Sequence, residues 1–151
     1  MRTRALASLI AGVVLLAGAA PAAAEGPPAV RAKSSKTVVR AALVSWCWLD
    51  GERGVCGDGV YRHTERALPY KPRAPLVFGT SFPVEGLSAC LMRIGDDGRV
   101  APLGVCLPLT RGEDAKWRGQ MPKNLRGANS LWVHVDGPGS NGAEYAVSVR
   151  R

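Results

Sequence analysis

Four cysteines are the residues whose type and spacing have the clearest chemical consequence in this chain. They stand at positions 47, 56, 90 and 106, and no two of them form a Cys-x-x-Cys pair. That spacing disfavours a zinc site, whereas four cysteines in an oxidising compartment predict two disulfides with three possible connectivities. We expect the pairs Cys47–Cys56 and Cys90–Cys106, because each pair lies within one predicted hairpin.

The first cysteine pair encloses a predicted turn. Between the cysteines the chain runs Trp-Leu-Asp-Gly-Glu-Arg-Gly-Val, and Asp and Gly suit the backbone angles of a four-residue hairpin loop. A crosslink from Cys47 to Cys56 places Trp48 opposite Val55 and leaves residues 50–53 as the loop. The disulfide therefore predicts the register of a hairpin, which concerns folding and not activity.

Histidine, the side chain most used in acid–base catalysis, occurs only at positions 63 and 134. His134 is two residues from Asp136 in a predicted strand, so both side chains face outward, and two ligands make a poor metal site. A serine nucleophile needs an oriented base, and the sequence contains no Gly-x-Ser-x-Gly elbow. We predict no catalytic residue, no metal ligand and no cofactor, and expect a protein that is not an enzyme.

Aromatic and basic residues are interleaved in the loop from Asp58 to Pro75, which also contains glycine and proline. Such a loop suits an anionic ligand through charge attraction and ring stacking. A solvated crossover loop stiffened by its prolines accounts for the same composition. On the first hypothesis the candidate binding residues are Tyr61, Arg62, His63, Arg66, Tyr70, Lys71 and Arg73.

The N-terminal residues are organised like a secretory signal peptide. Arg2 and Arg4 precede an apolar stretch that is short for a membrane span, and three alanines end at Ala24. We predict a signal peptide over residues 1–24, cleavage near Ala24, no transmembrane segment in the mature chain and a secreted protein. Residues 25–36 are expected to be a flexible linker or tail, followed by a single β-sandwich domain over residues 37–151.

The mature chain is basic. Removing Arg2 and Arg4 from the 20 Lys and Arg residues leaves 18 against 12 Asp and Glu, a net charge of +6. This favours an anionic partner such as a cell-envelope polymer or a membrane surface, without specific nucleic-acid recognition. The charges are spread along the chain and form no block, so solubility alone also accounts for them.

Period-two patterns dominate the mature chain, and no segment shows sustained helical periodicity. Residues 131–135 alternate between apolar and polar side chains, as do residues 145–149, and a glycine-rich loop joins the two runs. This is the pattern of a β-hairpin with one buried face. Other strand-like runs lie at 37–49, 76–82, 87–94, 99–109 and 116–121. The expected fold is all-β, an immunoglobulin-like β-sandwich of about seven short antiparallel strands with two disulfides.

The run Trp46-Cys47-Trp48, followed by Val55-Cys56 and Asp58, resembles a segment of small exported bacterial β-sandwich proteins of unknown function. In that group an aromatic-Cys-Trp run precedes a Val-Cys-x-Asp run. A glycine-rich hairpin there ends on an aromatic-x-Val-x-Val strand, as residues 145–149 do here. The resemblance covers most of residues 43–149, and the second cysteine pair departs from it. It implies export and a sandwich fold, and it implies no activity.

Three classes of function follow. The first is a secreted, non-catalytic β-sandwich module that binds a cell-envelope polymer, another exported protein or a small ligand. The second is a secreted protease inhibitor or small-molecule carrier, and a hydrolase is the least favoured. A flat basic or aromatic face would favour the first class, a deep apolar cleft a carrier, and an exposed rigid loop an inhibitor.

Overall fold

The structure, a computed structural model, describes residues 26–50 and 53–151. The predicted signal peptide lies outside the described residues. The two described ranges contain twelve strands and no α-helix, and therefore no helix that could span a membrane. The strands are β1 (Val30–Ser34), β2 (Thr37–Arg40), β3 (Ala42–Asp50), β4 (Arg53–Asp58), β5 (Leu68–Pro69), β6 (Pro75–Thr80), β7 (Gly86–Ile94), β8 (Val100–Cys106), β9 (Thr110–Arg111), β10 (Trp117–Gln120), β11 (Ser130–Asp136) and β12 (Gly142–Arg150).

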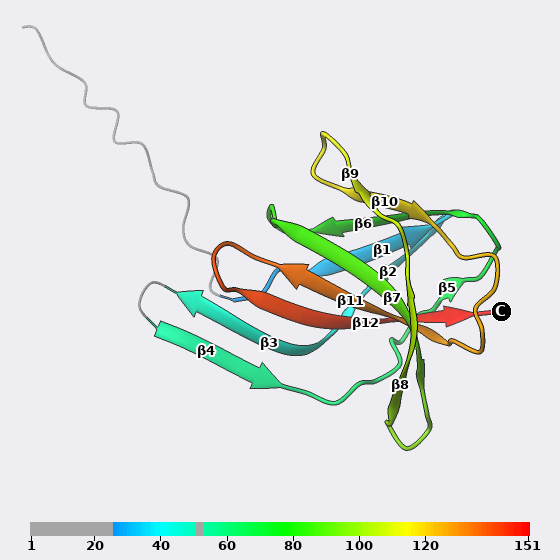
Figure 1. Ribbon diagram of the computed structural model, residues 1–151, viewed down its shortest axis with the longest axis horizontal. Coiled ribbons are helices and arrows are strands. Elements are labelled where there is room, and N and C mark those ends of the chain that lie inside the picture. Colours follow the sequence, from blue (N-terminus) through cyan, green and yellow to red (C-terminus); the bar gives the residue numbers. More distant parts are fainter. Residues whose placement is uncertain (1–25, 51–52) are drawn as a thin grey trace, which may run out of the picture.

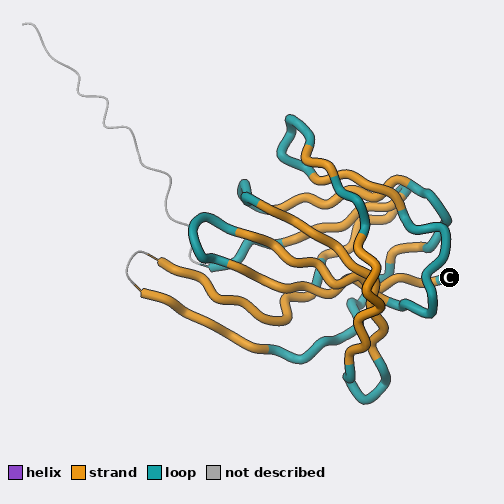
Figure 2. The backbone as a smooth tube through the Cα atoms, viewed as in Figure 1, coloured by secondary structure: helices purple, strands orange, loops and turns teal. Residues whose placement is uncertain are grey.

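The strands form two sheets (Figures 1 and 2). Sheet A has the order β2-β1-β6-β10-β9, and sheet B has the order β4-β3-β12-β11-β7-β8. Neighbours in both orders are antiparallel. The short strand β5 pairs in parallel with the end of β12. The chain passes repeatedly from one sheet to the other, so the sheets are parts of one folding unit.

Alternate side chains of both sheets meet in the main hydrophobic core, and a second, smaller buried cluster is formed by Val44, Met92, Ile94 and Ala146 of sheet B. Leu76 and Phe78 face inward from β6, while Leu131 and Val133 face inward from β11, and all four are buried. Every second residue of a strand points to the same face, which is why the apolar residues of these strands share a side. The predicted C-terminal hairpin is confirmed, since β11 and β12 pair along the whole length of β11. The fold is an all-β, two-layer β-sandwich.

The prediction that residues 25–36 are a flexible tail is wrong. Within that range β1 lies between β2 and β6, so it pairs on both sides within sheet A. Val30 and Ala32 are fully buried in the core. Just before β1, the carbonyl oxygen of Pro28 accepts a hydrogen bond from the hydroxyl of Tyr145 on sheet B. The folded domain therefore begins before residue 37.

The composition of β1 explains this error. Its inward positions hold small side chains, and its outward positions hold Arg31 and Lys33, which are exposed. The basic outward face dominates the composition, so the period-two pattern of a half-buried strand was hidden.

The run from residue 37 to residue 49 predicted one strand, or two in line. The structure has two strands, β2 and β3, which are separated at Ala41 and belong to different sheets. Together with β1 and the two-residue strands β5 and β9, this raises the strand number above the expected seven. A strand of two residues is too short to show a periodic pattern.

Both predicted disulfides are confirmed, Cys47 with Cys56 and Cys90 with Cys106. They connect β3 to β4 and β7 to β8 across directly opposed positions. Since β4 and β8 are the outermost strands of sheet B, each disulfide attaches an edge strand to its neighbour. An edge strand has only one hydrogen-bonded neighbour, so the crosslinks reinforce the two least supported strands of this sheet.

The register of the first hairpin is also as predicted, because Trp48 lies opposite Val55. The loop expected at residues 50–53 is shorter, since Asp50 and Arg53 are still paired with each other.

Candidate functional site

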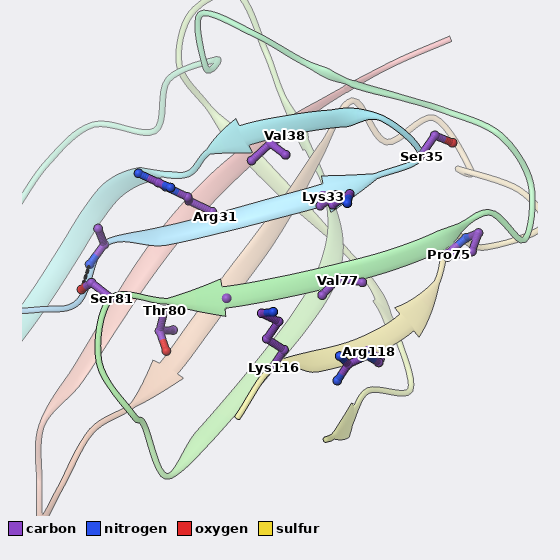
Figure 3. A pocket seen from close by; sticks show the side chains of 12 residues that line it. Arg31, Lys33, Ser35, Val38, Pro75, Val77, Thr80, Ser81, Lys116 and Arg118 are labelled. Atoms are coloured by element: carbon purple, nitrogen blue, oxygen red, sulfur yellow. Dashed lines mark hydrogen bonds between the residues drawn. The ribbon is translucent and has the colours of Figure 1, made fainter. Parts of the chain in front are cut away.

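A groove of about 760 Å³ lies on the outer face of sheet A, which points away from the core (Figure 3). Arg31 and Lys33 of β1 line it on one side, with the Arg31 side chain directed away from β6, and Lys116 and Arg118 line it on the other side, beside and on β10. Strand β6 runs between β1 and β10 and forms the floor. We call these four side chains the groove cations.

The pairing register places the groove cations opposite one another across β6. Val77 on the floor is opposite Lys33 of β1 and opposite Arg118 of β10. This level of the groove therefore has one lysine and one arginine on either side of a small apolar residue.

At the next level along β6, the arginine stands on the β1 side and the lysine on the β10 side. Gly79 on the floor is opposite Arg31, and Lys116, directly before β10, lines the groove from the other side. Positions two apart on a strand are about 6.6 Å apart, and strands separated by one neighbour are about 9.5 Å apart. The groove thus has two levels of paired positive charge, spaced along β6.

The floor of the groove is open and largely apolar. A Cβ atom added at Gly79 would meet no atom within 4 Å. On β6, Val77 and Pro75 are apolar, whereas Thr80 and the following Ser81 add polar groups at one end. Val38 of β2, beyond β1, is apolar and 43% exposed. A ligand lying along β6 would contact hydrocarbon below and positive charge on both sides.

One carboxylate outside the groove acts on two of its cations. Asp114 accepts two hydrogen bonds of 2.7 Å from the guanidinium of Arg118 and lies 3.3 Å from the Nζ atom of Lys116. These contacts, chiefly the one with Arg118, hold the pKa of the Asp114 carboxyl well below its usual range, and the same pair raises the pKa of Arg118. Among the described residues, Arg31 and Lys33 make no ion pair, so the β1 side carries the less compensated charge.

Comparison with protein-family models, with curated proteins and with solved structures finds no match. The site is therefore interpreted from its own geometry.

The loop that the sequence identified as a binding surface is anchored to sheet B. The hydroxyl of Tyr61 donates to the carboxylate of Glu144 at 3.1 Å, and Ser45 donates to the same oxygen at 2.9 Å. Burial, with Glu144 nearby, raises the pKa of Tyr61 to about 12. The hydroxyl of Tyr70 donates to the backbone carbonyls of Pro122 and Lys123. Both tyrosine hydroxyls thus stabilise the fold.

His63 also makes an internal contact. Its Nδ1 atom is 3.3 Å from the hydroxyl oxygen of Ser148, which accepts a hydrogen bond from the backbone N–H of Thr64. Since Ser148 is buried, this histidine–serine contact attaches the loop to β12. The remaining candidates are basic and exposed: Arg62, Arg66, Lys71 and Arg73. The loop as a ligand-binding surface stays a prediction that rests on these four charges.

The second histidine lies on the outer face of sheet B. His134 Nε2 is 3.0 Å from Asp136 Oδ1, and both side chains are about half exposed. Within the part of the chain that the structure describes, no group of three or more His, Cys, Asp or Glu side chains could hold a metal ion.

None of the four groove cations was predicted from the sequence as a binding residue. Arg31 and Lys33 were assigned to the tail, and Lys116 and Arg118 lie in a run that was treated only as a short strand. The available signal was alternation, since each pair is separated by one residue that faces the core. Which strands become neighbours is a long-range property, and no local pattern indicated that β1 and β10 flank β6.

Proposed function

We propose that this protein is an exported, non-catalytic β-sandwich module that binds an anionic polymer of the cell envelope in the groove of sheet A. The observation that carries the proposal is the opposed pairs of cations along β6. Four positive side chains line one open surface, and among the described residues no carboxylate lines it. Clustered charge on a concave surface attracts anions more strongly than the same charge spread over a molecule.

The alternatives are less well supported. A carrier needs a deep apolar cleft, whereas the groove of sheet A is open and lined by cations. An inhibitor needs an exposed rigid loop, whereas the loop from Asp58 to Pro75 is attached to sheet B through Tyr61 and Thr64 and to the segment after β10 through Tyr70. Two disulfides are compatible with an oxidising compartment. The immunoglobulin-like character, the bacterial origin and the signal peptide remain parts of this proposal.

The test compares two variants that lose equal charge. In the groove variant Arg31, Lys33, Lys116 and Arg118 are all replaced by Gln. In the loop variant Arg62, Arg66, Lys71 and Arg73 are replaced in the same way. Both proteins and the wild type are cosedimented with purified cell walls over a salt series.

We expect the groove variant to lose most of its binding and the loop variant to retain most of it. Wild-type binding should weaken as salt rises past about 0.15 M, where the Debye length is roughly 8 Å. Wild-type retention of the groove variant would overturn the proposal, and equal losses in both variants would show that the net charge acts diffusely.

A further inference from the structure

We infer that the groove holds a single extended chain of a polyol phosphate polymer, lying along β6 with its phosphates between the two rows of cations. This inference rests on the proposed function and specifies the ligand class of the same site. Three observations carry it: charge on both walls, an open apolar floor, and a lining without aromatic side chains.

The two charged walls favour a polymer whose charge lies on its own backbone. At the level of Val77, Lys33 and Arg118 stand on the strands to either side, where a ligand would compete with Asp114 for Arg118. A phosphodiester in the chain has two non-bridging oxygens, so it can accept a hydrogen bond from each wall at once. Arginine also matches phosphate geometry with two parallel N–H groups.

The floor favours a thin, unbranched chain. Gly79 leaves open space between Arg31 and Lys116, and Val77 and Pro75 present hydrocarbon to the ligand. The methylene groups of a polyol can rest on this surface while the phosphates meet the cations at two levels, about 6.6 Å apart. A lipid bilayer or a nucleic-acid duplex is too wide to enter between the two rows of groove cations. It would contact only the charged ends of these side chains.

The lining also disfavours single-stranded nucleic acid. Proteins that bind such strands without sequence preference use aromatic side chains as stacking platforms for the bases. None of the described residues that line this groove is aromatic. A phosphate polymer without bases needs only cations for its phosphates and an apolar surface for its methylene groups, and the groove has both.

A variant that fills the floor without changing the charge tests this inference. Gly79→Phe places a ring between the two rows, in a strand position where its Cβ meets nothing and the backbone is not left-handed. Gly79→Leu is a second, smaller blocking variant. Ser88→Phe, an exposed outward position on β7 of sheet B, controls for the effect of adding a surface aromatic residue. Thermal unfolding verifies that each variant is folded.

Binding of poly(glycerol phosphate) of defined length is measured by calorimetry for the full mature chain and each variant. We expect Gly79→Phe to weaken it by about tenfold or more, equivalent to about 1.4 kcal/mol, and Ser88→Phe to leave it unchanged. A single-stranded oligonucleotide and poly-glutamate of equal charge, and vesicles of anionic phospholipid, should each bind more weakly than poly(glycerol phosphate).

Two results would overturn the inference. If both Gly79 variants bind poly(glycerol phosphate) like the wild type, the chain does not lie on β6. If the oligonucleotide, poly-glutamate or the vesicles bind as tightly as poly(glycerol phosphate), the polymer class is wrong. In either case the proposed function stands as long as the groove variant loses binding to cell walls, and it falls separately if that variant does not.

Discussion

The hydroxyl of Tyr61 connects the loop from Asp58 to Pro75 to Glu144 on the outer face of sheet B. Because this hydroxyl titrates, the contact can be measured through the pH dependence of stability. Because burial raises its pKa from 10.0 to about 12, the fold favours the neutral phenol. Its contribution to the free energy of unfolding is complete below pH 10 and is lost as the pH rises through about 12. Melting temperature measured against pH should fall in this window for the wild type.

The matched variant is Tyr61→Phe, which keeps the ring and removes the titrating group. We expect a smaller fall in melting temperature between pH 10 and 12 than in the wild type. Some fall should remain, because burial also raises the pKa of Tyr145. Identical pH profiles for the two proteins would show that the loop is not held through this hydroxyl.

Asp114 limits the charge that the groove offers to a ligand. Its carboxylate binds Arg118 and Lys116, so a polymer phosphate must compete with it. Asp114→Asn keeps a side-chain acceptor for the turn and removes the competing charge. We expect anionic polymer to bind roughly threefold to tenfold more tightly at low salt, with the gain shrinking as salt rises.

Asp97→Asn is the control for this prediction. Asp97 occupies a comparable turn between β7 and β8, where it accepts from the backbone of Arg99 and pairs with its side chain. The substitution removes the same charge without touching a groove cation. Equal gains in both variants would mean that net charge, and not the local carboxylate, governs affinity.

At the scale of single elements, alternate residues of β1 have different roles. Its inward face fills the core, and its outward face supplies one wall of the groove. Val30→Ala should lower the free energy of unfolding by about 1–3 kcal/mol through the lost burial and the cavity left behind. Lys33→Ala should leave stability nearly unchanged and weaken polymer binding. Denaturant unfolding and calorimetry measure the two effects, and a Val30→Ala variant as stable as the wild type would contradict a packed β1.

The same element shows what a sequence can predict. Runs with large alternating apolar residues, such as 76–82 and 131–135, were recognised as strands because their pattern is local, although β6 already ends at Thr80. Both cysteine pairs were also predictable, since each lies within one hairpin. In β1 the inward residues are small, so the pattern was weak and the basic outward face suggested a linker. The weak pattern of β1 therefore explains both errors: the strand was taken for a tail, and Arg31 and Lys33 were left out of the candidate site.

Over the whole molecule, the four groove cations and a group of three carboxylates lie on the outer faces of different sheets. The groove cations lie on the outer face of sheet A. On the outer face of sheet B, Ser45 is opposite both Asp58 and Glu144, so these carboxylates share a side, and Asp136 lies on the same face. Net charge alone predicted an anionic partner, but not which face would meet it, because the sheet order is settled by contacts between distant residues.

The place of β12 in sheet B has a consequence for the order of events during synthesis. This strand is central, pairing with β3 on one side and β11 on the other, and with β5 at its end. Without it, sheet B falls into two unconnected parts, the β3–β4 hairpin and the group formed by β7, β8 and β11. A nascent chain that has not yet reached residue 142 therefore cannot complete this sheet on the ribosome. Closure of sheet B therefore waits for the late-synthesised residues, whereas every strand of sheet A is made before them.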